Sequence, residues 1–338
     1  MTMDNKIISV LHKLVALTGI AFDEMAWEPI QEGGNNRLLK LKIDTAQFIL
    51  KQYFISREEN WDRLKNESLF LGYAQSCGTG VVPKLIWVDA LNHFAVHEYI
   101  DGKKINPSDL DDDSIEQAIS FIEVINQAQF RKTEKAKALS QASDACLSRA
   151  IHVKSIQKRL DRLMALAPCD ALDKEAHGFV TKRLSPAFTN SMKSVELSNS
   201  ETVLERSGQI ISPSDFGFHN AIQRDDKRIF FIDFEYAGWD DPVKMICDFF
   251  CQPEIQVKEK YLKKVVNRFS RIVGEKSLEA DVENLLPLYR IKWCCIILNV
   301  FDPLIKDRKR FASFDIDYRE QQLTKAKDYF KEHYHGLC

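Results

Sequence analysis

Apolar and polar residues alternate with a period of two in much of the first hundred residues. Within 27–55, Leu39, Leu41 and Ile43 alternate with lysines, and a second apolar run, FILKQYF, follows after a polar break. This period predicts antiparallel strands joined by a turn. The later runs VVPKLIWVD and HFAVHEYID predict two more strands, separated by a short turn.

Apolar residues recur with helical spacing before and between these strands and through most of the rest of the chain. Ile7, Leu11, Leu14 and Val15 recur with helical spacing before them, and 58–76 predicts a helix between the third and fourth strands. The order is therefore helix, three strands, helix, two strands. A further helix is expected from 114 on, with Ser114 as its N-cap, followed by a polar helical insert at about 131–200 and more helices at the C-terminus.

The change of pattern near Asp101-Gly102 predicts two lobes. We expect a small antiparallel β lobe over 1–101 and a larger, mostly helical lobe over 102–338. The length of 338 residues agrees with this division, because one hydrophobic core usually supports about 250–300 residues.

Composition and charge exclude several classes of protein. With 45% hydrophobic residues the chain can build a core, and 47 Lys+Arg against 49 Asp+Glu leave no basic excess for nucleic acid. The longest apolar run, WCCIILNVF, is too short to cross a membrane. The eight cysteines are scattered and are expected to be reduced and mostly buried, with Cys247 and Cys251 in the core rather than on a metal. We therefore expect a cytoplasmic protein with no membrane or nucleic-acid partner.

The segment 210–253 carries the densest chemistry. It places Asp215 and Asn220 on one loop, a hairpin after them, and Asp233 at the end of an apolar strand. The turn at 224–227 brings Asp233 back beside Asn220. Carboxylate and amide oxygens suit Mg²⁺ together with substrate phosphates, and a second carboxylate can accept a proton from an attacking hydroxyl.

Residues 215–217 spell Asp-Phe-Gly, the metal-binding triplet of protein kinases. That interpretation requires a His-Arg-Asp loop upstream and an Ala-Pro-Glu segment downstream, and the sequence has neither. The five-residue offset between Asp215 and Asn220 favours a catalytic loop instead, with Asp233 as the metal carboxylate.

Four separated stretches, in order, resemble the aminoglycoside phosphotransferase and choline kinase group of small-molecule kinases, which have a protein-kinase-like fold. GGNNR at 33–37 resembles the family's nucleotide-binding loop, and HEYIDG at 97–102 resembles its hinge. Lys51 in FILKQY resembles the strand lysine, and Glu67 resembles the helix glutamate that orients this lysine. The resemblance covers about residues 25–255, and YAGWDDPVKMICDF continues it.

The resemblance implies a role for each matching position. Asp215 would be the catalytic base, and Asn220 and Asp233 the Mg²⁺ ligands. ATP would be bound by residues of the nucleotide loop, the lysine and glutamate pair, and the hinge: Gly33, Gly34, Asn35, Asn36, Lys51, Glu67, Glu98 and Ile100. The chain departs from the family where Pro213-Ser214 replaces His-Gly before Asp215 and where His219 replaces a glycine.

The sequence leaves rivals for two of these roles. Lys40, Lys42 and Arg37 compete with Lys51, and Glu58 and Glu59 compete with Glu67. The glycines at 33–34 could also make a simple hairpin turn.

The leading hypothesis is an ATP- and Mg²⁺-dependent phosphotransferase that acts on a hydroxyl of a small molecule, such as a sugar, an aminoglycoside or an amino alcohol. The alternative is a catalytically weak, nucleotide-binding pseudokinase or scaffold, which the Pro213-Ser214 departure motivates. A protein kinase is disfavoured by the missing Ala-Pro-Glu segment. The acceptor, the choice of ATP or GTP and the oligomeric state are not encoded in any recognisable pattern.

Overall fold

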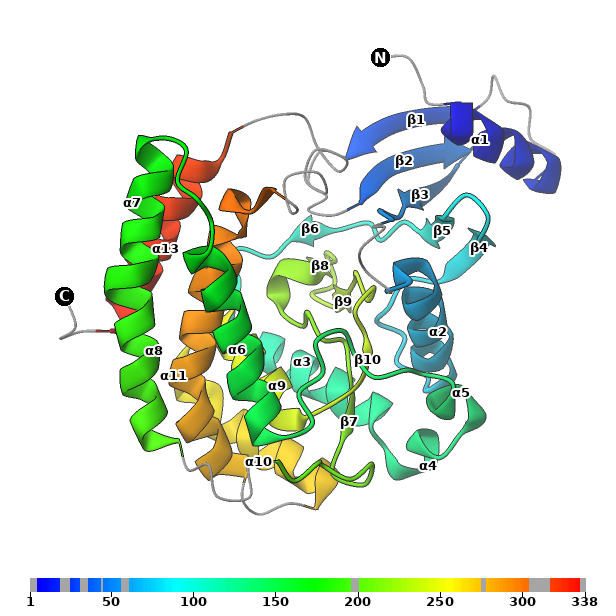
Figure 1. Cartoon of the computed structure of the whole chain (residues 1–338). Helices are drawn as coiled ribbons and strands as arrows, with labels where there is room; N and C mark the ends of the chain where they lie inside the picture. The colour runs from blue at the N-terminus through cyan, green and yellow to red at the C-terminus, as the bar shows by residue number, and fades with distance from the viewer. Residues whose placement is uncertain are drawn as a thin grey trace.

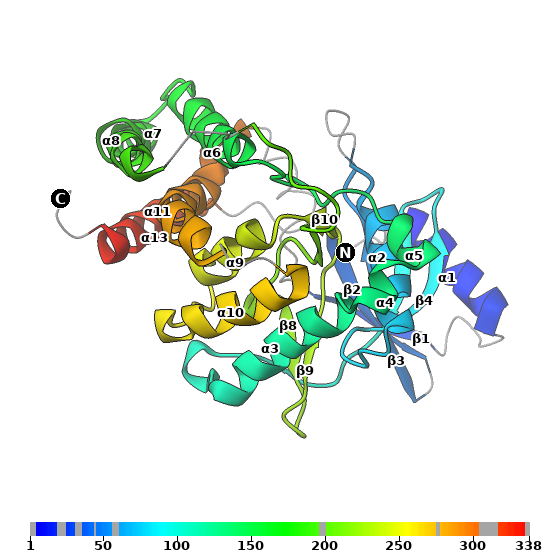
Figure 2. The same cartoon turned by 90° about the horizontal axis from the view of Figure 1, so that it is seen from below.

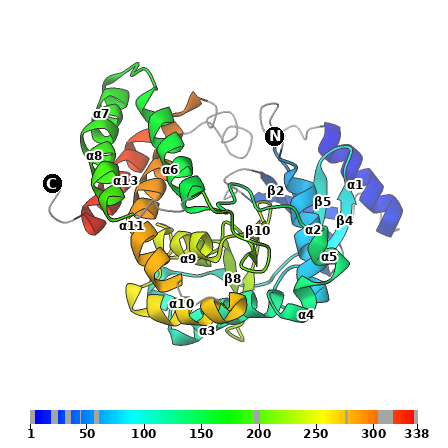
Figure 3. The same ribbon diagram turned by 60° about the horizontal axis from the view of Figure 1, so that its bottom comes forward.

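The largest sheet lies at one end of the molecule and most of the helices lie at the other (Figure 1). The computed structural model describes residues 5–18, 25–30, 36–43, 45–55, 61–195, 201–274, 278–303 and 317–334. The separation of the two kinds of element is also plain when the molecule is turned (Figure 3). It confirms the predicted α+β, bilobal arrangement.

The N-terminal lobe is built on a five-stranded antiparallel sheet of order β1-β2-β3-β5-β4. Its elements follow the predicted order of helix, three strands, helix, two strands. They are α1 (Asn5–Thr18), β1 (Met25–Ile30), β2 (Arg37–Ile43), β3 (Ala46–Gln52), α2 (Arg63–Ser76), β4 (Leu85–Asp89) and β5 (Phe94–Glu98).

Helix α1 covers one face of this sheet. Its Val10 and Leu11 pack with Leu41 and Leu50 of the strands in a small buried cluster. Because successive side chains of a strand point to opposite faces, Leu50 on the α1 face places the next residue, Lys51, on the other face. The alternation seen in the sequence therefore directs Lys51 away from α1 and toward α2.

Helix α2 begins after Asp62, whose side chain accepts a hydrogen bond from the backbone N–H of Lys65. This N-cap satisfies one of the free donors of the first turn. The buried face of α2 carries Glu67 and Phe70, and the Phe70 ring lies 4.6 Å from that of Phe234 in the second lobe. The helix thus connects the sheet to the helical lobe.

The second lobe has one large core shared by its helices and its short strands. Figure 2 shows α3 and α10 together, with α6, α7 and α8 farther from the sheet. The helices are α3 (Asp112–Ile125), α4 (Ala128–Arg131), α5 (Glu134–Lys137), α6 (Arg149–Met164), α7 (Ala171–Phe179), α8 (Ser185–Ser191), α9 (Pro242–Cys251), α10 (Leu262–Val273), α11 (Leu278–Ile297) and α13 (Arg319–His333).

Two local expectations are wrong. The N-cap of α3 is Asp111, whose carboxylate accepts from both the backbone N–H and the hydroxyl of Ser114, so Ser114 lies inside the helix. The insert at 131–200 is also not helical throughout: 138–148 contains no helix. There, Ala142 donates to the carbonyl of Trp239, and Ser140 accepts from the backbone N–H of Trp239.

The candidate catalytic residues lie on the loops that follow the short strands of this lobe. β7 (Ile210–Ser212) pairs with β10 (Gly238–Asp240), and β6 (Lys103–Lys104), β8 (Ala221–Gln223) and β9 (Ile229–Phe231) form a three-stranded sheet. The β8–β9 turn closes with the N–H of Arg224 donating to the carbonyl of Arg228, which confirms the predicted hairpin.

In the part of the chain that the structure describes, no helix combines the length and the apolar surface needed to cross a bilayer. The seven described cysteines are free thiols, and all but Cys169 are buried. Among the described residues no cluster of His, Cys, Asp and Glu has the size to hold a metal by itself.

Candidate active site

Lys51 is the basic residue at the centre of the candidate site. It is 6% exposed on β3, and its Nζ lies 2.7 Å from Oε2 of Glu67 on α2. Of its rivals, Lys40 pairs with Glu28 on the neighbouring strand and stacks on Tyr99, and Lys42 is exposed. Glu58 and Glu59 lie outside the described residues.

Glu67 is fixed by three donors. Lys51 and the hydroxyl of Tyr53 both donate to Oε2, the latter at 2.6 Å, and the backbone N–H of Phe234 donates to Oε1 at 3.2 Å. The donor Phe234 directly follows Asp233, so the orientation of Glu67 depends on the second lobe as well as on the sheet.

Asp233 joins the lysine from the other lobe. Its Oδ1 lies 2.6 Å from Nζ of Lys51, and Oε2 of Glu235 lies 4.0 Å from the same ammonium group. Asp233 has a left-handed backbone (φ 64°), which asparagine and aspartate tolerate better than most residues. The strand β9 ends two residues earlier, and this turn directs the carboxylate back toward Lys51.

The group carries more negative than positive charge. Burial alone would lower the pKa of Lys51, but the carboxylates of Asp233, Glu67 and Glu235 more than offset this and raise it. Burial alone would raise the pKa of Glu67, but Lys51 and the donated hydrogen bonds hold it below its ordinary value. Burial raises the pKa of Asp233, and the neighbouring Glu235 and Glu67 add to this increase although Lys51 opposes it.

Asp215 lies on the loop between β7 and β8. Its Oδ1 is 3.2 Å from Nε2 of His219, and the side-chain amide of Asn220 donates to its backbone carbonyl at 3.1 Å. Burial alone would raise the pKa of Asp215, but His219, Asn220 and the more distant Lys292 hold it below its ordinary value. With 38% of its side chain exposed, Asp215 is an ionised carboxylate that a hydroxyl can reach.

Asn220 and Asp233 lie at the same end of the β8–β9 hairpin. The backbone N–H of Ile232 donates to the carbonyl of Asn220 at 2.9 Å. Both side chains are partly exposed, and each has an oxygen atom that can bind a metal ion. The carboxylates of Glu67, Asp233 and Glu235 outnumber the two cations beside them, Lys51 and Arg63. A divalent cation would compensate the excess negative charge, and the oxygens of Asn220 and Asp233 fit Mg²⁺ with phosphate oxygens completing its shell.

Of the other residues predicted to bind the nucleotide, some lie outside the described residues and some lie within them. Gly33, Gly34 and Asn35 lie outside the described residues. Asn36 is buried, with its amide nitrogen donating to Glu235 at 2.6 Å and its oxygen accepting from the backbone of Phe54, so its side chain connects the loop to the site. Glu98 is the last residue of β5, and Ile100 lies two residues after it.

Sequence reasoning missed several residues that shape the site. Tyr53 and His97 support Glu67, and Arg63 lies 3.7 Å from Glu235, yet their partners are far away in the sequence. Lys244 and Lys292 lie behind the catalytic loop. Lys244 could have been noticed in the sequence, because it and Asp248 are the only charged residues of the helix PVKMICDFFC, and Lys244 lies four residues from an aspartate on either side.

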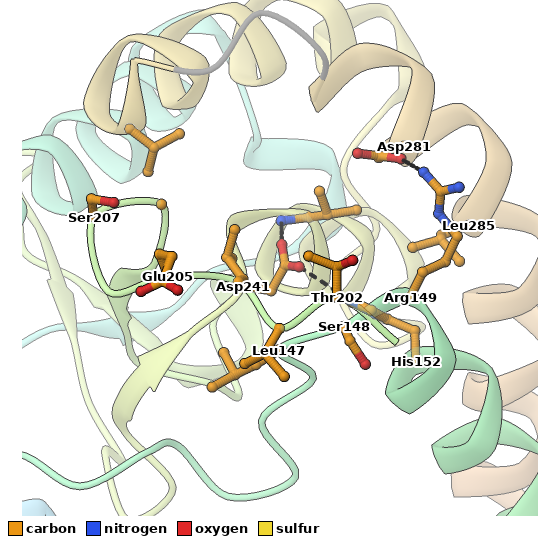
Figure 4. Close-up of a pocket in the computed structure, with 15 residues that line it drawn as sticks. Leu147, Ser148, Arg149, His152, Thr202, Glu205, Ser207, Asp241, Asp281 and Leu285 are labelled. Atoms are coloured by element: carbon orange, nitrogen blue, oxygen red, sulfur yellow. Dashed lines mark hydrogen bonds and ion pairs between the residues drawn. The ribbon is translucent and has the colours of Figure 1, made fainter. Parts of the chain in front are cut away.

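A pocket of about 650 Å³ lies elsewhere in the helical lobe, between α6, 202–208 and the first turns of α9 and α11 (Figure 4). None of the predicted site residues lines it. Two pairs of its lining side chains contact each other: Arg149 with Asp281, and His152 with Asp241. The pocket is therefore separate from the candidate active site.

No family model and no curated protein matches the sequence. Solved structures do match the fold. The choline kinase LicA from Streptococcus pneumoniae has a TM-score of 0.60 at 17% identity, with 97% of this chain and 100% of that chain covered. The chain has the fold of the choline kinases and aminoglycoside phosphotransferases.

Two further structures with this small-molecule kinase fold agree. A spectinomycin phosphotransferase solved in complex with ADP and spectinomycin has a TM-score of 0.59 at 14% identity, covering 96% of this chain and 95% of that chain. An ethanolamine kinase from Plasmodium vivax has a TM-score of 0.57 at 15% identity, covering 99% of this chain and 93% of that chain. The fold implied by the four sequence stretches is thereby confirmed.

Proposed function

We propose that the protein is an ATP- and Mg²⁺-dependent phosphotransferase that transfers the γ-phosphoryl group to a hydroxyl of a small molecule. One observation carries the proposal. Three elements far apart in the sequence bring Glu67 and Asp233 within 2.7 Å and 2.6 Å of the buried ammonium group of Lys51. Lysine and carboxylates in this arrangement suit the binding of a nucleotide and its metal.

Each side chain has a defined task. Lys51, oriented by Glu67, contacts the nucleotide phosphates, and Asn220 and Asp233 hold Mg²⁺. The cation supplies charge neutralisation on the phosphates when bound. Asp215 orients the acceptor hydroxyl and takes its proton as the new oxygen–phosphorus bond forms and the bond between the γ-phosphorus and the β–γ bridging oxygen breaks, which releases ADP. The pKa of Asp215, held below its ordinary value, keeps the carboxylate ionised at neutral pH.

The acceptor belongs beside Asp215, in the helical lobe. The segment next to the catalytic loop offers one exposed carboxylate, Asp144, whose neighbour Ser143 accepts a hydrogen bond from Ser214. Asp144 pairs with Arg159 of α6. A sugar, an aminoglycoside or an amino alcohol presents hydroxyl or amino groups that this pair of side chains can bind. We also propose that the reaction takes place in the cytoplasm, with neither nucleic acid nor membrane as a partner.

The test is a coupled ADP-release screen over sugars, amino alcohols and aminoglycosides. The wild type should release ADP with one acceptor class only when Mg²⁺ is present. Asp233→Ala should lose both this turnover and the rise in melting temperature that Mg·ATP produces. Asp225→Ala, an exposed acid in the β8–β9 turn, is the matched control and should keep both.

The Pro213-Ser214 departure favours one second candidate, a nucleotide-binding protein with little or no transfer activity. It predicts a Mg·ATP-dependent rise in melting temperature with no ADP release for any acceptor in the screen. Acceptor-dependent release above the rate of ATP hydrolysis would exclude it.

A further inference from the structure

A network of buried charges lies directly behind the catalytic loop. We call it the buried lysine network; it consists of Ser214, Asp240, Lys244, Asp248 and Lys292, all between 0% and 8% exposed. Nζ of Lys244 lies 2.8 Å from Oδ2 of Asp240 and 3.5 Å from Oδ2 of Asp248. Nζ of Lys292 lies 2.7 Å and 2.8 Å from the two oxygens of Asp248.

The network contacts the catalytic loop at one residue. Nζ of Lys244 donates to the hydroxyl of Ser214 at 3.4 Å, and that hydroxyl donates to the carbonyl of Ser143 at 3.3 Å. An ammonium group has no lone pair, so Lys244 can only donate a hydrogen bond to the hydroxyl oxygen of Ser214 and cannot accept one from it. The two contacts therefore use the hydroxyl in both directions and fix its rotation.

Ser214 needs such support. Its backbone is left-handed (φ 67°), a conformation that costs an ordinary residue about 1 kcal/mol or more. Its N–H donates to the hydroxyl of Ser212 at 2.9 Å. Because Ser214 immediately precedes Asp215, any rotation of this backbone would turn the Asp215 carboxylate away from its place in the loop.

Stability alone does not account for the network. Replacing buried ion pairs by apolar residues of similar size is often neutral or stabilising, and the rest of α9 is apolar and buried. Asp240 and Asp248 also keep the pKa of Lys244 raised although burial alone would lower it, so its ammonium charge is permanent. A permanent charge aimed at the loop is suited to holding it.

We propose that Lys244 is a positioning residue: its ammonium group holds the hydroxyl of Ser214, and through that strained residue it sets the orientation of the Asp215 carboxylate. This inference rests on the proposed function only for the chemical role of Asp215. The contacts that support it are all between residues of the protein and involve no substrate or nucleotide. Lys292 donates to both oxygens of Asp248 and so fixes the position of the carboxylate that it shares with Lys244.

The test uses the double variant Lys244→Met, Asp240→Asn, which removes the lysine without leaving an unpaired buried aspartate. Its kcat should fall about tenfold to hundredfold while the KM for ATP stays near that of the wild type. Ser214→Ala should lower kcat similarly, and combining it with the double variant should add little, because both changes break the same contact. Lys244→Arg, which keeps the charge and a donor, should recover part of the rate.

Several results would overturn the inference. One is an unchanged kcat in a folded double variant, and another is full additivity of the losses in kcat when Ser214→Ala is combined with the double variant. A third is an unchanged kcat in Ser214→Ala alone, which can be measured even if the double variant fails to fold. Hydrogen exchange of the 210–217 amides gives a readout without turnover: exchange should rise in Ser214→Ala and in the double variant, and unchanged exchange in both contradicts the proposal. A wild type without turnover would disprove the proposed function but leave this exchange test valid.

Discussion

Lys51 is the residue through which the two lobes meet in the candidate site. Its ammonium group contacts Glu67 of the first lobe and Asp233 of the second, with Glu235 4.0 Å away. Arg63 also lies beside Glu235, but the three carboxylates still outnumber these two cations. The arrangement is therefore suited to a divalent cation, and it also predicts that the lysine matters for stability as well as for activity.

Lys51→Met should destabilise the protein by about 3–5 kcal/mol in urea unfolding, because it leaves the buried carboxylate of Glu67 without a paired cation. It should also lower kcat/KM by about a hundredfold or more, because a charge that faces the phosphates is lost. Lys42→Met, on the exposed face of β2, is the matched control and should change neither quantity. Wild-type stability and activity in Lys51→Met would refute the central role of this ammonium group.

His97 predicts a pH dependence of stability. Burial lowers the pKa of His97 to about 4, from 6.5, and its Nε2 lies 3.2 Å from the hydroxyl of Tyr53. Since the folded-state pKa lies below the unfolded-state value, this contribution is fully present above pH 6.5 and is lost as the pH falls toward 4.

Between pH 7 and pH 5 the wild type should lose about 2 kcal/mol more unfolding free energy than His97→Gln, which keeps a donor for Tyr53 but does not titrate. Urea denaturation at both pH values measures this difference. Above pH 7.5 the two proteins should change in parallel, and identical pH profiles down to pH 5 would show that His97 is not buried in its neutral form.

At the scale of elements, the sequence was most informative where the signal is local. Alternation along 37–52 fixed the faces of β2 and β3, and with them the side on which Lys51 lies. The path of 138–148 could not be predicted, because it is set by hydrogen bonds to β10, about a hundred residues away. The N-cap of α3 was missed because Asp111 and Ser114 are both good capping residues and only the geometry distinguishes them.

Gly238 tests this contact between 138–148 and β10. A Cβ at this position would lie 2.5 Å from the carbonyl oxygen of Ser140 and 2.6 Å from the backbone nitrogen of Ala142. Gly238→Ala should therefore destabilise the protein by about 2 kcal/mol and lower kcat, because Ser143 of the displaced segment supports Ser214.

Gly178→Ala is the matched control for this change. Gly178 lies in α7, with open space around an added Cβ, and the substitution should stabilise the helix by up to about 1 kcal/mol. Thermal and urea unfolding of both variants check the pair. Equal stability of Gly238→Ala and the wild type would mean that the segment does not pack as closely on β10 as described.

At the scale of the whole molecule, the two-lobed plan could be predicted from the change of period and the order of the motifs. The assembly of the site could be predicted only in part. Lys51 contacts Glu67 and Asp233, and Asn220 lies at the same end of the β8–β9 hairpin as Asp233. The support from Tyr53, His97 and the buried lysine network depends on folded contacts between distant segments. Residues that touch the substrate leave short motifs, but residues that hold them in place mostly do not.

The central claim is that Asp215 serves acceptor phosphorylation by Mg·ATP. The direct test compares acceptor-dependent ADP release by the wild type, Asp215→Asn and the control Asp225→Asn. Asp215→Asn should lose about a hundredfold or more in kcat while keeping the Mg·ATP-dependent rise in melting temperature, and Asp225→Asn should be unaffected. A kcat for Asp215→Asn within about threefold of the wild type would contradict this claim.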